Sequence, residues 1–298
     1  MATSNYQYPF GTATASGNAV TVDMMLNGPT RVTRAVSDVA LQNFWADRLF
    51  STPGGVEGGA VLYDVLTAND LYPTRDVQNV EPGAEFPILT FDRPTPLVAQ
   101  VEKFGGKFFV TDEARDRNDQ TQMRNGVRKI ANAVNKGLHT RAVAVVDAAA
   151  TTYSRTLAAA NTWTTSTTTV ASSLTSVLGP AAVFASVQLQ ADTDELGVQF
   201  DSFIVNPTQA SKFTMFYGAN NWRQILADSN LTMYSSNRVT AGTAYFFEEG
   251  GVGEMRFEKP LGTETWREQA TERTWVQSSI RPVMYVTNPY SLLKVTGL

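Results

Sequence analysis

The sequence predicts an α+β fold in which helices and antiparallel strands are mixed. Three observations support this class. A long amphipathic helix covers residues 112–150, an extended Pro-rich segment precedes it, and from residue 263 onward apolar residues alternate with a period of two. A strand-helix-strand repeat is absent from the pattern, which argues against a parallel α/β sheet.

The predicted helix over residues 112–150 carries one apolar stripe, whose members recur at the three-and-four spacing of a helix with one buried face. Asp112 is placed to cap its N-terminus. Arg and Lys side chains cover the opposite face, so we expect a helix that lies across another layer of the protein. At about 1.5 Å per residue it would extend roughly 50 Å. The stripe expected in the core consists of Met123, Val127, Ile130, Val134, Leu138 and Val145.

Residues 72–110 are predicted to form a long projecting hairpin. Extended runs at 85–91 and 97–110 flank the turn Asp92-Arg93-Pro94, and the prolines of this segment exclude helix. A two-stranded ribbon is marginally stable alone in water, so it needs a surface, which we expect a neighbouring subunit to supply. The side chains expected to contact that neighbour are Arg75, Asp76, Glu81, Glu85, Phe86, Asp92 and Arg93.

Composition limits the functional classes. The 298 residues include no cysteine, which excludes disulfides and thiolate chemistry. The net charge of -4 gives no electrostatic reason to expect tight binding to nucleic acid. No apolar stretch approaches the ~20 residues of a membrane span. Residues 1–30 are small and polar and are expected to form an arm without helix, followed by one helix over residues 31–50.

Catalytic and ligand-binding residues are not apparent. His139 is the one histidine, and its place on the long helix favours an ordinary helix-surface or interface role over that of a catalytic base. One histidine without cysteine leaves no His/Cys metal site with the usual ligand count, and we expect no cofactor. Two acidic clusters remain as candidates for a calcium site or for a catalytic acid/base pair, but their sequence context is more typical of solvated turns. These clusters are Asp192, Asp194 and Glu195, and Glu248, Glu249 and Glu254.

Several segments in a fixed order carry a family resemblance. An arm, a long hairpin, Thr111-Asp112-Glu113 before a long helix, the segment 201–207, and the strands at 273–286 follow one another. This order and spacing resemble the major capsid protein of tailed double-stranded DNA bacteriophages, which has the Hong Kong 97-like fold. The resemblance extends from about residue 35 to the end of the chain.

The resemblance implies a division of the chain into regions. These are an N-terminal arm (1–45), a linker into the peripheral domain (46–71), the extended loop (72–110), the peripheral domain (111–179) with its spine helix (112–150), the axial domain (180–262), and return strands of the peripheral domain with the C-terminal end (263–298).

The resemblance also implies a structural protein that is not an enzyme. Its copies would form the hexamers and pentamers of an icosahedral shell around double-stranded DNA, assembled in the host cytoplasm and present in the virion capsid. Expected partners are a separate scaffolding protein, a portal and a decoration protein, with no sequence-specific DNA contact and no membrane. Because no lysine lies between Tyr72 and Glu102, we expect no Lys-Asn crosslink between subunits. The alternatives are an encapsulin-like cargo shell of the same fold and a carboxylate-dependent hydrolase.

Overall fold

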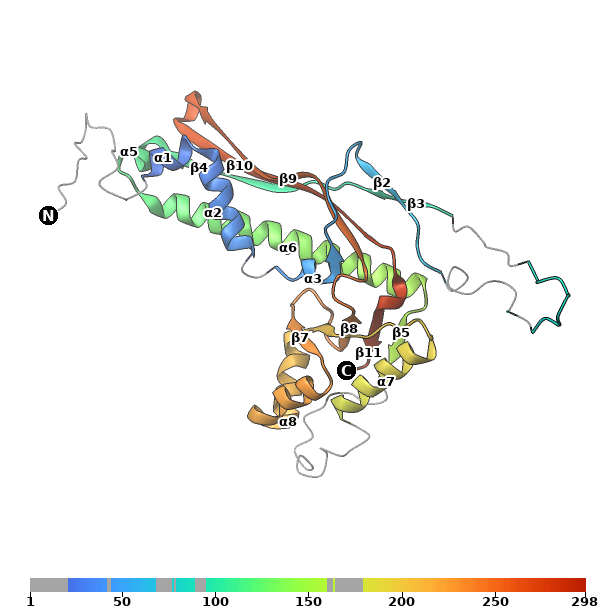
Figure 1. Cartoon of the computed structure of the whole chain (residues 1–298). Coiled ribbons are helices and arrows are strands. Elements are labelled where there is room, and N and C mark those ends of the chain that lie inside the picture. The colour runs from blue at the N-terminus through green and yellow to red at the C-terminus, as the bar shows by residue number, and fades with distance from the viewer. Residues whose placement is uncertain are drawn as a thin grey trace.

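The computed structural model describes residues 21–41, 44–67, 77, 79–88, 95–159, 163 and 179–298. One long helix runs along a first sheet and ends beside a second, and a two-stranded ribbon projects from the first (Figure 1). The helices are α1 (Val22–Leu26), α2 (Pro29–Leu41), α3 (Ala46–Leu49), α5 (Asp112–Asp116), α6 (Gln120–Thr152), α7 (Pro180–Thr193) and α8 (Pro207–Asp228). The strands are β1 (Phe50–Ser51), β2 (Ala60–Tyr63), β3 (Leu97–Gln100), β4 (Phe104–Thr111), β5 (Thr156–Ala158), β6 (Ser202–Val205), β7 (Thr232–Ser235), β8 (Thr243–Phe247), β9 (Gly253–Glu268), β10 (Arg273–Val286) and β11 (Leu292–Thr296).

The first sheet has the strand order β1-β9-β10-β4 and packs against α6 and α2. Strand β10 pairs antiparallel with both β4 and β9. Along β10, Thr274, Val276, Ser278 and Ile280 are buried, whereas the residues between them are half-buried. This alternation confirms the period of two expected from the sequence, and it turns every second side chain away from the helices.

The long helix begins later than predicted. The chain turns at Asn118, which has a φ of 52°, and this turn separates the short α5 from the 33 residues of α6. The N-caps are Thr111 for α5 and Asp119 for α6, so Asp112 is a helical residue and not the predicted cap. Asp112 instead pairs with Arg267 of β9. A residue with positive φ cannot continue an α-helix, and the predicted single helix over 112–150 is therefore wrong in its first turns.

The apolar stripe of α6 is confirmed in all but one position. Five of its predicted members are buried, but Val145 is only partly buried, and Val146 occupies the core position in its place. Because a helix has 3.6 residues per turn, a stripe of regularly spaced residues gradually rotates around a long helix. Towards the C-terminal end the residue that faces the core is therefore one position later than the spacing predicts. The confirmed members are Met123, Val127, Ile130, Val134 and Leu138.

The N-terminal region contains more helix than predicted. Helix α1 begins after Thr21, whose hydroxyl accepts a hydrogen bond from the Met24 backbone, and α2 begins at Pro29. All of α1 and the start of α2 lie in the region that was expected to be an arm without helix. The predicted single helix over 31–50 is also wrong, because α2 ends at Leu41, α3 is a separate turn, and Phe50 belongs to β1. Its apolar residues are divided among these three elements and do not form one continuous helical face.

The second sheet has the order β5-β11-β8-β6-β7 and packs against α7 and α8. Its core is aromatic, with the rings of Phe203 and Phe246 stacked at 4.9 Å between centroids and Phe184 and Phe213 packed beside them. The predicted buried strand at 200–205 is confirmed as β6, which is buried throughout.

The chain passes between the two sheets at three places. Strand β5 follows α6 and joins the second sheet, β9 follows β8 and joins the first sheet, and β11 follows β10 and joins the second sheet at the C-terminus. Arg155, between α6 and β5, is buried and pairs with Asp194 at 2.7 Å. This ion pair attaches the segment that leaves α6 to the C-terminal end of α7, which packs on the second sheet.

We expect Val134→Asp to unfold the subunit, because it places an unpaired carboxylate in the core at a cost of more than about 3 kcal/mol. Asn132→Asp is the matched control, since it introduces the same carboxylate on an exposed position of α6. Urea unfolding followed by circular dichroism measures both. Equal stability of the two variants would contradict the assignment of the buried stripe.

Candidate functional site

The ribbon that projects from the first sheet is formed by β2 and β3, which pair antiparallel with Leu62 opposite Val98. These two side chains share the outer face and are largely exposed. On the inner face Tyr63 packs on Tyr285 with 4.6 Å between ring centroids. The sequence predicted that 97–110 is one strand paired with 85–91, and this is wrong. The run is divided into β3, which pairs with β2, and β4, which pairs with β10.

The tip of the projecting segment contains a tight turn. The backbone N–H of Ala84 donates to the carbonyl of Glu81 at 3.0 Å, and Gly83 has a φ of 90°. Proline at the second position and a residue with positive φ at the third define a type II turn. The predicted turn at 92–94 lies outside the described residues.

Three of the seven predicted contact residues lie in the described part of the loop. Glu81, Glu85 and Phe86 are exposed, and the Phe86 side chain is 80% exposed. Ile88 is 76% exposed. Arg75, Asp76, Asp92 and Arg93 lie outside the described residues. Phe86 and Ile88 are two residues apart and place exposed apolar area at the described tip of the loop.

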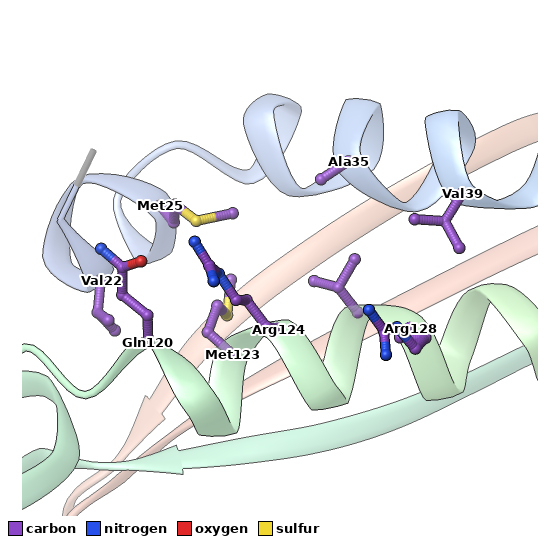
Figure 2. A pocket seen from close by; sticks show the side chains of 9 residues that line it. Val22, Met25, Ala35, Val39, Gln120, Met123, Arg124 and Arg128 are labelled. Carbon is purple, nitrogen blue, oxygen red and sulfur yellow. The ribbon is translucent and has the colours of Figure 1, made fainter. Parts of the chain in front are cut away.

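A groove of about 610 Å³ lies at the other end of the first sheet, between the helices α1 and α2 and the N-terminal half of α6 (Figure 2). Its walls are mainly apolar. Arg124 and Arg128, one turn apart on α6, lie along it, and within the described residues neither side chain has a hydrogen bond or ion pair. The apolar lining consists of Val22, Met25, Ala35, Val39, Met123 and Val127.

Sequence reasoning placed Arg124 and Arg128 on a solvated face and did not detect this groove. The available signal was the i, i+4 arginine pair directly beside the stripe residues Met123 and Val127. The missing information was the position of α1 and α2, which supply the second wall. Their location is fixed by tertiary contacts such as Asp23 with Arg115 at 2.7 Å and the Val22 N–H with Asn118 at 3.0 Å.

The face of the first sheet that points away from α6 carries an aromatic row. Phe109, Trp275 and Trp266 lie opposite one another on β4, β10 and β9. Lys107 and Arg273 lie over the Trp275 ring, at 4.4 and 4.7 Å from its centroid. This surface combines exposed aromatic area with cations that are already engaged by the rings.

His139 is buried where α6 meets the segment before α3, so of the two ordinary roles expected for it the helix-surface one is wrong. Its ring stacks on Trp45 at 4.6 Å and on Phe44 at 5.3 Å, and its Nε2 accepts a hydrogen bond from the Trp45 backbone at 3.4 Å. Burial and the positive charge of Arg238 lower its pKa from 6.5 to about 4. The neutral imidazole thus attaches the segment before α3 to the long helix.

The acidic clusters are paired structurally. Glu248 accepts from the Ser291 hydroxyl at 2.9 Å, Glu249 accepts from the Tyr234 hydroxyl at 2.8 Å, and Glu254 pairs with Arg256 at 2.7 Å. Asp192 accepts from Gln188 and Asp194 pairs with Arg155. Within the described residues, no three acidic or histidine side chains form a group that could hold a metal ion. No helix in the same part of the chain is long and apolar enough to cross a bilayer.

Comparison with known proteins identifies the family. The family described as phage capsid protein matches residues 94–295. None of the curated protein sequences compared with the chain matches it. The capsid structure of cyanophage P-SCSP1u is similar with a TM-score of 0.60 at 14% identity, over 85% of this chain and 88% of that chain. A virus-like particle from Pyrococcus furiosus is similar with a TM-score of 0.59 at 10% identity, over 89% and 98% of the two chains. At these identities the structural likenesses establish the fold.

We expect the stability of the subunit to depend on pH through His139. Because the pKa of His139 is lower in the folded state, the unfolded chain takes up the proton first. Stability is therefore intact above about pH 6.5 and falls as the pH decreases towards 4, by about 1 to 2 kcal/mol between pH 7 and 5. His139→Gln removes this contribution and keeps a hydrogen-bond acceptor. Urea unfolding of the wild-type protein and of the variant at pH 7 and 5 tests this prediction. An equal loss of unfolding free energy in both proteins would contradict it.

Proposed function

Because the chain belongs to the phage capsid protein family, we propose that its copies form the hexamers and pentamers of the phage head. As a major capsid protein it is a structural, non-enzymatic component of the icosahedral virion shell, and it associates with other copies of itself. The match over residues 94–295 is the observation on which this function rests. The shell would enclose double-stranded DNA without reading its sequence, consistent with the net charge of -4.

The projecting segment supports a role in contacts between subunits. Its described tip exposes Phe86 and Ile88, and a two-stranded ribbon such as β2–β3 has little stability of its own. A shell of many copies requires contacts that are individually modest and collectively strong, so that incorrect contacts can dissociate during assembly. A segment that buries its apolar side chains only on a neighbour meets this requirement.

Expression of the chain alone, and together with a candidate scaffolding protein, tests the function directly. We expect hollow particles of uniform diameter, or rings of five and six subunits, in negative-stain electron microscopy. The chain carries no lysine between Tyr72 and Glu102, so these particles should dissociate into single chains in denaturing gels. A protein that stays monomeric under all conditions would count against the proposed assembly.

Deletion of residues 80–94 should leave a folded and soluble subunit that no longer forms shells. The physical reason is that the described part of this segment is exposed and contributes little to the core of its own subunit. Circular dichroism measures folding, and electron microscopy measures assembly. Replacement of the same residues by a Gly-Ser linker of equal length separates the loss of side chains from the shortening of the chain. Unfolding of the deletion variant would show that the segment supports its own subunit.

A further inference from the structure

We propose that the helix layer formed by α2 and α6 binds the phosphate backbone of double-stranded DNA without reading its sequence. This inference rests on the proposed function, since DNA enclosed by a shell meets one face of the subunits that form the wall. It assigns that face to the two helices, and it turns the opposite face of the first sheet towards the outside of the shell.

The charges of the chain are unevenly distributed. The sequence has a net charge of -4, but α2 and α6 together carry seven Lys and Arg residues and only two carboxylates, Asp38 and Asp147. Asp147 pairs with Lys294, and Arg141 pairs with Glu102 at 2.9 Å. The other six cations of the layer are all exposed, and they are Arg31, Arg34, Arg124, Arg128, Lys129 and Lys136.

These six cations lack a carboxylate partner. Within the described residues, none of their side chains forms an ion pair or a hydrogen bond. Residues 1–20 contain no Asp or Glu, so that part of the chain cannot supply a partner. By contrast, each cation of β9 and β10 is paired with a carboxylate at 2.5 to 3.1 Å, and these cations are Arg256, Lys259, Arg267, Arg273 and Arg281. Positive charge that is free to meet an outside anion is therefore concentrated on the helices.

The four exposed cations of α6 without partners share one side of the helix. At 3.6 residues per turn they fall within about 140° around the helix axis. This arc lies roughly opposite Gly126 and Gly137, where the helix approaches the phenylalanine rings of β4. The cations therefore point away from the first sheet. Helix α2, which carries the other two, lies beside α6 on the same side of the sheet (Figure 1).

The density of these cations predicts weak binding. Arg124 and Lys136 are 12 residues apart, which is about 18 Å along the helix. A duplex of that length carries roughly ten phosphates, since one charge occupies about 1.7 Å of its axis. The cations of α6 thus match fewer than half of the charges that lie against them. One subunit binds weakly, in agreement with the net charge of -4, and many subunits in one wall add their contributions.

The shape of the layer excludes sequence reading. The major groove of B-DNA is about 12 Å wide and admits a single helix. Two helices packed side by side are about 20 Å wide, so the layer lies across the groove and cannot enter it. Its arginines and lysines then reach phosphates, which position a duplex without distinguishing its bases.

An acidic protein segment fits the layer less well. Such a segment would place apolar side chains in the groove between α1, α2 and α6, where only Arg124 and Arg128 are available to its carboxylates. The other four cations do not line this groove. Cations that continue beyond an apolar depression are expected of a surface that follows a phosphate backbone.

Neutralisation of the layer tests the inference on the full chain. The helix-layer variant combines Arg124→Gln, Arg128→Gln, Lys129→Gln and Lys136→Gln. Fluorescence anisotropy with a duplex of about 30 bp and random sequence, at salt concentrations from about 50 to 200 mM, measures binding by subunits. We expect the affinity at the lowest salt to fall at least about tenfold. The slope of log affinity against log salt should decrease by about 3 to 4, because each lost phosphate contact removes about 0.9.

The matched control neutralises four cations of the sheet and gives the same net charge. It combines Arg256→Gln, Lys259→Gln, Arg267→Gln and Arg281→Gln. Circular dichroism measures folding of both variants, and we expect the control to keep the affinity and salt dependence of the wild type. Absence of binding in the wild type, or equal losses in the two variants, would overturn the inference. A helix-layer variant that binds DNA normally but no longer forms shells would show that these cations serve contacts between proteins, and the proposal would be wrong.

Electron microscopy of the same proteins separates this inference from the proposed function. Hollow wild-type particles together with unchanged DNA binding in the helix-layer variant would support the function and overturn the binding surface. A wild-type chain that forms no particles, with DNA binding lost in the helix-layer variant alone, would count against the function and support the binding surface.

Thiol labelling measures which face is enclosed, independently of DNA. The chain has no cysteine, so Asn132→Cys places one thiol on the exposed side of α6, and Glu264→Cys places one on the sheet face that points away from α6. A maleimide carried on a long polyethylene glycol cannot enter a closed shell. We expect it to label both variants as dissociated subunits, but only Glu264→Cys in intact particles. Labelling of Asn132→Cys in intact particles at the rate seen in subunits would place the helices outside, and the proposal would be wrong.

Discussion

The close approach of α6 to β4 is the constraint on which the rest of the structure depends. Two glycines of α6 provide the space. A Cβ atom on Gly126 would lie 2.3 Å from the Phe108 ring, and one on Gly137 would lie 3.1 Å from the Phe104 ring. Both phenylalanines lie on the inner face of β4, so each ring packs directly on the helix backbone. Because β4 is held at this distance, the backbone hydrogen bonds that pair β4 with β10, and β10 with β9, place the rest of the sheet along the helix.

The same helix determines the orientation of the second sheet. Asp147, near the end of α6, accepts from the Tyr245 hydroxyl at 2.7 Å and pairs with Lys294, which places β8 and β11 against it. Arg155 then donates to the carbonyl of Leu292 and pairs with Asp194 of the second sheet's helical layer. A buried arginine that lost Asp194 would be strongly unfavourable, so these contacts fix the end of α6 against β11 and α7.

The sequence could predict what is periodic and local. The α6 stripe, the alternation along β10 and the buried β6 follow from side-chain patterns over consecutive residues. Non-local features could not be predicted. The extended run at 97–110 is compatible with any partner strand, and only the fold shows that β3 pairs with β2 and β4 with β10. The turn at Asn118 is closed locally, by the hydrogen bond from the Asp119 N–H to the Ala114 carbonyl, but the contact that places α1 beside it, from the Val22 N–H to the Asn118 side chain, joins residues 96 positions apart. The groove requires α1, α2 and α6 together, and its arginines alone resemble a solvated face.

The loop also shows how an assembling protein can expose apolar side chains without aggregating. Phe86 and Ile88 would pair indiscriminately with any apolar surface if the loop were neutral. Glu81 and Glu85 prevent this, because two loops repel each other and a carboxylate is costly to bury without a partner. The same carboxylates become favourable when a neighbouring copy supplies cations beside its own apolar surface. Repulsion from incorrect partners and attraction to the correct one then come from the same two side chains, which is how a weak contact can be specific.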